Sequence, residues 1–168
     1  WRLAILVQPM FVLLVAAAYV SPVGSSTMML DNMWLKMHVL GAMVGYALFT
    51  LAAFAAFAVY TREAYLKAHV TSSFNEKLPV LPAAERGQFV LLGIGEAVLL
   101  GALVAGSMYL QTTEGVWFEA TAKNIFAYLT FAVVALLLAA RFMWGTRGSR
   151  AAKVVLGTYA LLVLAYLG

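Results

Sequence analysis

Residues 37–61 read MHVLGAMVGYALFTLAAFAAFAVYT and contain no aspartate, glutamate, lysine or arginine. A helix that crosses the hydrocarbon core of a bilayer needs about 20 mostly apolar residues. Further stretches share this character: residues 3–30, 124–140 and 154–168 carry no charge, and residues 87–113 carry only Glu96. The pattern predicts an all-α integral membrane protein, built as a bundle of about five transmembrane helices.

The composition of the whole chain agrees with this fold class. Of its 168 residues, 64% are apolar or aromatic and 11% are charged, and the mean hydropathy is +0.92. Soluble domains lie nearer half apolar and a quarter charged, so a soluble globule and a disordered chain are both excluded. Cysteine is absent, which excludes disulfides and thiolate metal sites.

The expected spans are approximately 3–20, 35–60, 88–110, 124–143 and 154–168, which together form a single transmembrane helical domain over residues 1–168. Residues 71–86 form the longest polar stretch, where we expect Pro79 and Pro82 to break any helix. The last run is short for a span, and the sequence begins with Trp1 rather than Met. We therefore expect the chain to be a fragment of a larger polytopic protein, with further segments at both ends.

The basic residues predict how the helices are oriented. If the helices alternate in direction, nine lysines and arginines fall on one side, and only Lys36 and Lys123 fall on the other. Cytoplasmic loops carry the excess of positive charge, so loops 61–87 and 144–153 are expected in the cytoplasm. The net charge of +4 thus indicates contact with the lipid bilayer and its anionic headgroups, and we expect no nucleic-acid partner.

His38 is the first candidate site residue, because ionisable groups inside a membrane span are rare and often functional. Trp34 precedes it by four positions, and Gly41 and Gly45 follow at three and seven, so all four share one helix face. The two glycines form a small-xxx-small pattern that lets another helix approach closely. Two interpretations stay open. In the first, His38 is an axial haem ligand and the glycines leave room for the macrocycle or a close helix. In the second, it hydrogen-bonds a neighbouring helix or lies in the headgroup layer.

Glu96 is the second candidate, as the acid that lies well inside an apolar run. An unpaired carboxylate is costly to bury there, so it should be protonated, paired or turned toward a wet cavity. A proton-relay role is one interpretation. A structural hydrogen bond to a tyrosine, a serine or a backbone group on a neighbouring helix is the other.

Three stretches resemble the transmembrane cytochrome c assembly family, the group that contains CcsA, CcmC and HemX-like proteins. They are MHVLGAMVGYALFTLAAFAAFAVYTREAYLKAH, KLPVLPAAERGQFVLLGIGEAVLLGALVAG and RFMWGTRGSRAAKVVLGTYALLVLAYLG, which begin at residues 37, 77 and 141. The third is the most specific, and the resemblance covers roughly residues 34–168. It implies a membrane protein of the bacterial inner membrane that carries, presents or senses haem at the outer face.

The resemblance also implies site residues. The loop EGVWFEATAKNIFAYLTF matches the family's tryptophan-rich outer segment through Trp117, while Thr121 replaces its aspartate. In the HemX-like branch a histidine precedes the lysine of this loop, where this sequence has Ala122. The implied haem contacts are therefore His38, Trp34 and Trp117, with His38 as the metal ligand. The pattern resembles a divergent HemX-like member.

The leading hypothesis from the sequence is thus a haem-handling membrane protein that is not an enzyme, works in cytochrome complex assembly and takes other membrane subunits or cytochrome biogenesis proteins as partners. The alternative is an accessory or structural membrane subunit that holds no cofactor. A weaker third is a small transporter that uses Glu96 for proton coupling.

Overall fold

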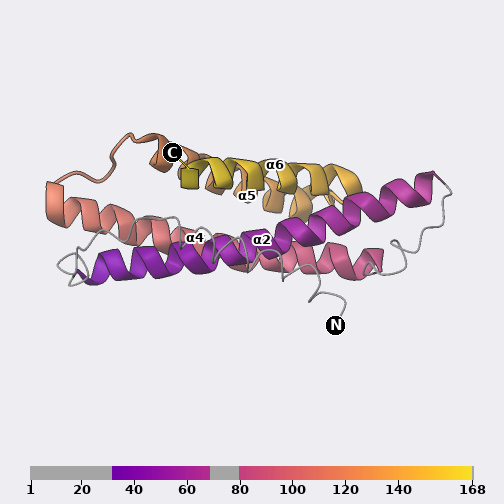
Figure 1. The fold of residues 1–168 in the computed structure, drawn as a ribbon, viewed down its shortest axis with the longest axis horizontal. Helices are drawn as coiled ribbons and strands as arrows, with labels where there is room; N and C mark the ends of the chain where they lie inside the picture. The colour runs from indigo at the N-terminus through magenta and orange to yellow at the C-terminus, as the bar shows by residue number, and fades with distance from the viewer. Residues whose placement is uncertain (1–31, 69–79, 168) are drawn as a thin grey trace.

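The computed structural model of the protein describes residues 32–68 and 80–167, and these residues form four α-helices. They are α2 (Met33–Lys67), α4 (Leu81–Glu114), α5 (Ala122–Trp144) and α6 (Gly148–Leu167). Figure 1 shows long α2 and α4 side by side, with α5 and α6 packed together along them. The described part of the chain is therefore an all-α bundle.

Helices α2 and α4 are antiparallel and make the most extensive contact in the bundle. Gly95 of α4 faces Leu48 and Phe49 of α2, and both Phe49 and Gly95 are buried. Small side chains let two helix backbones approach closely, which favours helix association in a membrane, where the lipid is as apolar as the protein core. The core accordingly combines small and large apolar residues: Phe49, Ala52, Ala56, Ala58, Val59, Ala84, Leu92, Leu99, Val134, Leu137, Ala151, Ala152, Val155 and Leu162.

Among the described residues, three helices are long and apolar enough to cross a membrane: α2, α4 and α5. The prediction of five spans is therefore wrong for this part of the chain, and the predicted span 3–20 lies outside the described residues. The predicted span 154–168 falls in α6, which begins earlier, at Gly148. Helix α6 is not one of these three helices.

The prediction that Pro82 breaks a helix is also wrong. Helix α4 begins at Leu81, after the N-cap residue Val80, and Pro82 stands in its first turn. Proline is favoured there, because the first backbone N–H groups of a helix have no partner within the helix. As a result α4 runs well beyond the predicted apolar run 88–110, and α2 likewise extends past 35–60 to Lys67.

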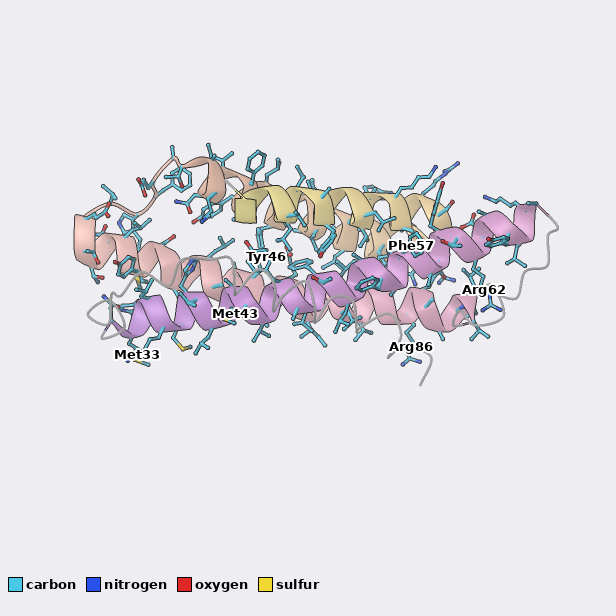
Figure 2. All side chains as sticks on the ribbon, viewed as in Figure 1. Met33, Met43, Tyr46, Phe57, Arg62 and Arg86 are labelled. Atoms are coloured by element: carbon cyan, nitrogen blue, oxygen red, sulfur yellow. The ribbon has the colours of Figure 1, made fainter. Side chains whose placement is uncertain are left out.

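Most of the described lysines and arginines lie at one end of the bundle. Figure 2 places Arg62 and Arg86 near one end and Met33 near the other. The first end also holds the α5–α6 connection, because Glu63 of α2 and Glu85 of α4 both bond to the start of α6. We call it the basic end, since it gathers these described cations: Arg62, Lys67, Arg86, Arg141, Arg147, Arg150 and Lys153.

Candidate functional site

His38 lies on α2 at the end of the bundle opposite the basic end, where it contacts α4. Its ring Nδ1 stands 2.7 Å from the backbone carbonyl oxygen of Ala102, 64 residues further along the chain. A carbonyl oxygen only accepts hydrogen bonds, so Nδ1 must carry the proton and donate it. In the neutral ring this leaves Nε2 with the lone pair, which is the nitrogen available to a metal.

Two glycines make this position of the ring sterically possible. A Cβ atom at Gly106 would lie 2.8 Å from His38 Nδ1 and 3.1 Å from Cε1, so a side chain there would collide with the ring. A Cβ at Gly41 would lie only 3.0 Å from Cβ of Ala102. Glycine at position 41 therefore allows the close approach of α2 to α4, and glycine at position 106 leaves room for the His38 ring.

The other residues predicted on the His38 face differ in their surroundings. Gly45 is buried against α4, but more loosely, with Val98 Cγ1 4.0 Å from the place of a Cβ. Trp34 is 41% exposed in the first turn of α2, and its backbone N–H donates to the N-cap side chain of Asn32 at 2.9 Å. This face of α2 therefore packs against α4 at Gly41 and Gly45.

Trp117 lies elsewhere, in the loop between α4 and α5, and is 59% exposed. With Ser107, Tyr128 and Phe131 it lines an open, mainly apolar hollow of about 320 Å³ between α4 and α5. The hydroxyl oxygens of Ser107 and Tyr128 stand 3.0 Å apart there.

Position 107 is one residue, and therefore about 100° of helix rotation, away from Gly106. The described contacts place Trp117 and His38 on different faces of α4, and they do not bring the two side chains together.

Glu96 lies on the inner face of α4 between the buried residues Leu92 and Leu99. Only 9% of the residue is exposed, and neither carboxyl oxygen has a hydrogen-bond partner among the described residues. The structural hydrogen bond expected from the sequence is therefore not found in this part of the chain. Leaving a buried polar group unpaired costs about 1–3 kcal/mol, so this carboxyl needs an explanation beyond packing.

Sequence reasoning missed a polar cluster at the basic end. The backbone N–H of Gly148 donates to Glu85 Oε1, and that of Ser149 donates to Glu63 Oε2, each at 2.5 Å. The Ser149 hydroxyl adds a bond of 3.2 Å to Glu63 Oε1, which also accepts from Lys67 Nζ at 2.6 Å. Carboxylates are favoured at a helix N-terminus because its free N–H groups and dipole are positive.

The α5–α6 connection is held by a second set of contacts in the same cluster. Arg141 Nη1 donates to the carbonyl of Thr146 at 3.0 Å, and its guanidinium lies 4.3 Å from the ring centre of Phe89 on α4. Gly145 and Gly148 both have positive φ angles, 63° and 69°. The repeated glycine–arginine pattern of residues 145–150 was the signal in the sequence, and its role is to turn the chain and present N–H groups.

No group of three or more histidine, cysteine, aspartate or glutamate side chains in the described ranges could hold a metal ion by itself. The donor set that the structure does present is a single imidazole, held by a backbone carbonyl. One such ligand would suit the iron of a haem, because the porphyrin supplies nitrogen donors of its own and histidine is a common protein ligand to haem iron.

These features define a polytopic α-helical membrane protein that holds one oriented histidine at a helix–helix contact. The chain belongs to the Cytochrome C assembly protein family, whose pattern matches residues 2–168.

One relative is an uncharacterized 28.8 kDa protein of Azospirillum brasilense, described by its place in the nifR3-like 5′ region, which is 33% identical over 171 residues. The alignment covers 100% of this chain and 63% of that protein, so the chain spans less than two thirds of its relative. No solved structure matches the chain.

Proposed function

We propose that this protein handles haem in cytochrome c assembly, as a divergent HemX-like member that binds or presents the cofactor without catalysing a reaction. The observation that carries the proposal is the hydrogen bond from His38 Nδ1 to the carbonyl of Ala102, at 2.7 Å. Histidines that ligate metals almost always donate their other ring N–H to a carboxylate, a carbonyl or water, which fixes the ring and raises its basicity.

In this proposal His38 binds the haem iron through Nε2, while Ala102 and Gly106 hold the ring in place. Haem, when bound, supplies an iron centre that the rest of the assembly machinery can receive or sense. The sequence has two histidines, and His69 lies outside the described residues. Any second histidine ligand would therefore come from outside the described ranges, either from this chain or from a partner among other membrane subunits or biogenesis proteins.

The proposed location is the outer face of the bacterial inner membrane, with loops 61–87 and 144–153 in the cytoplasm. Its support is the separation of charge along the bundle. The cations of the basic end gather at the last turns of α2, the first turns of α4 and the α5–α6 connection, while Lys36 and Lys123 stand at the opposite end, the end of His38. Positive residues favour the cytoplasmic side, which puts His38 toward the outside.

The experiment is an absorbance spectrum of detergent-purified protein after supplementation with haem. We expect a Soret band that His38→Ala abolishes and that His69→Ala leaves in place, because the two variants remove the same side chain from different parts of the chain. A Soret band of equal strength in all three proteins would contradict the assignment of His38.

The alternative is an accessory membrane subunit that holds no cofactor, and the same contact supports it. The bond from His38 to Ala102 joins α2 to α4, and Gly41 packs against the same residue, so the histidine also serves as a helix–helix link. A colourless preparation after haem supplementation, together with a loss of thermal stability in His38→Ala, would favour this second function.

A further inference from the structure

The open hollow between α4 and α5 has no part in the haem proposal. Leu103 and Val104 of α4 and Phe131 of α5 line it with apolar side chains, and Trp117 of the connecting loop lines it as well. Val104 is 52% exposed, so the hollow opens on the outside of the bundle. Because α4 and α5 are both long and apolar enough to cross a membrane, an apolar hollow that opens outward from them faces lipid.

The interface between α4 and α5 leaves room for such a ligand. These two helices contact each other less extensively than α2 contacts α4 or α6, and less than α5 contacts α6. The space between them, about 320 Å³, is therefore not closed by their own side chains.

Two hydroxyl groups are the polar part of this hollow. The hydroxyl oxygens of Ser107 and Tyr128 stand 3.0 Å apart, and each group carries one hydrogen. One hydroxyl donates to the other, so one of the two hydrogens is left without an acceptor among the described residues. A ligand with an acceptor oxygen can receive this hydrogen.

The same tyrosine also holds the loop that carries Trp117. The rings of Phe118 and Tyr128 meet edge to face, with their centres 5.4 Å apart and their planes at 72°, a favoured arrangement of aromatic pairs. Tyr128 thus contacts α4 through its hydroxyl and the loop through its ring. The hollow is built by α4, the loop and α5 together, and these contacts fix its shape.

The position of the hydroxyl pair along α4 indicates which acceptor it meets. Ser107 lies seven residues, or about 10 Å, before the end of α4 at Glu114, inside the uncharged end of that helix. Tryptophan and tyrosine are enriched where the hydrocarbon of a bilayer meets its headgroups, and Trp117 and Tyr128 both line the hollow. The ester carbonyls of phospholipids lie at this level, and a carbonyl oxygen only accepts hydrogen bonds.

We propose that the hollow binds one phospholipid from the leaflet at the His38 end. An acyl chain lies against Leu103, Val104 and Phe131, and an ester carbonyl of the same lipid accepts the remaining hydrogen of the hydroxyl pair. No covalent bond changes. The inference goes beyond the haem proposal and does not depend on it, because the hollow and His38 lie on different faces of α4.

The test is native mass spectrometry of the purified full chain, without haem, after removal of lipid and addition of a phosphatidylcholine. This headgroup carries no net charge, so attraction to the basic end does not contribute. We expect one lipid to bind, roughly fivefold more tightly than a diether phosphatidylcholine with the same chains, which lacks the ester carbonyls and therefore one hydrogen bond.

The double variant Ser107→Ala with Tyr128→Phe should bind the ester and ether lipids equally. Both positions are changed because either hydroxyl alone can donate to the lipid. Thr113→Ala is the control: it removes an exposed hydroxyl from the same end of α4, one that bonds the carbonyl of Tyr109 at 2.8 Å, and it should keep the preference for the ester.

A matched pair of valine variants tests the apolar part of the site. Val104→Phe places a larger side chain in the hollow and should lower lipid affinity roughly tenfold, because the acyl chain loses apolar burial. Val90 is equally exposed on α4, at 52%, but lies outside the hollow, so Val90→Phe should bind lipid as the wild type does.

The proposal is overturned if the wild type retains no lipid or binds the ester and ether lipids equally, or if the two valine variants have equal affinities. A fall in haem affinity in Val104→Phe with lipid binding unchanged would also overturn it, and would assign the hollow to haem.

Discussion

His38 and Gly106 depend on each other, because the imidazole ring occupies the space that a side chain at position 106 would need. The ring is at the flexible end of its side chain, so it can move away from an added methyl group more easily than two backbones can separate. A change at position 106 therefore acts on the orientation of His38 more than on the bundle. A substitution at position 106 therefore separates the two functions proposed for His38, the haem ligand and the helix–helix link.

We expect Gly106→Ala to reduce haem affinity roughly tenfold or more, as changes at groups that orient metal ligands do. Thermal stability should change little, because alanine stabilises a helix by about 0.5–1 kcal/mol over glycine while the lost hydrogen bond costs about 1 kcal/mol. Haem titration followed at the Soret band, with a melting curve of the same protein, measures both quantities.

Gly101→Ala is the control for this change, since a Cβ at position 101 would meet nothing within 4 Å. It should leave haem affinity unchanged. If Gly106→Ala bound haem as well as Gly101→Ala does, the position of the ring against α4 would have no part in haem binding.

At the scale of elements, α6 is attached to the bundle through its first turn. Glu63 comes from α2 and Glu85 from α4, and each accepts a backbone N–H at the start of α6. A Cβ at Gly148 would lie 2.7 Å from Glu63 Oε2 and would displace this carboxylate, and the φ of 69° is one that favours glycine. Three helices are joined at one point by two carboxylates.

We expect Glu63→Ala and Glu85→Ala each to destabilise the start of α6 by about 1 kcal/mol, the usual effect of removing an N-cap side chain. Amide hydrogen exchange should rise in the first turns of α6 and remain unchanged in the middle of α4. Mass spectrometry of the exchanged protein resolves these segments.

Glu119→Ala serves as the comparison, because Glu119 is exposed in the loop between α4 and α5. It should leave exchange in α6 at the wild-type rate. Equal protection of α6 in all three variants would mean that the helix is held by its core residues alone.

The sequence predicts the elements better than it predicts how they meet. Runs that carry no charge, or Glu96 alone, identify α2, α4 and α5, since burial in lipid demands mostly apolar residues. Pro82 misled the prediction because proline ends a helix or begins one, depending on its position. The contacts of His38 with Ala102 and of Glu63 with Ser149 join residues 64 and 86 positions apart, and no local pattern specifies such pairs.

At the scale of the whole molecule, the basic end and the His38 end lie at opposite ends of long helices. The two acids at the basic end whose bonds are described, Glu63 and Glu85, accept backbone N–H groups of α6. Seven described cations surround these two acids, so the basic end keeps an excess of positive charge that attracts anionic lipid. The orientation proposed for the bundle thus rests on a charge difference that the fold keeps, because the end of α2, the start of α4 and the α5–α6 connection lie at the same end of the bundle.

Cysteine labelling tests this orientation directly, because these 168 residues contain no cysteine of their own. Ala68 and Ala120 are exposed in connections at opposite ends of the bundle, so single cysteines there should leave the packing intact. We expect Ala120→Cys to react with a membrane-impermeant thiol reagent in intact cells, and Ala68→Cys to react only after permeabilisation. Both should react equally in detergent, which controls for local accessibility. Labelling of Ala68→Cys in intact cells, with protection of Ala120→Cys, would place the basic end outside and His38 toward the cytoplasm, and haem would then have to be received from the inner side.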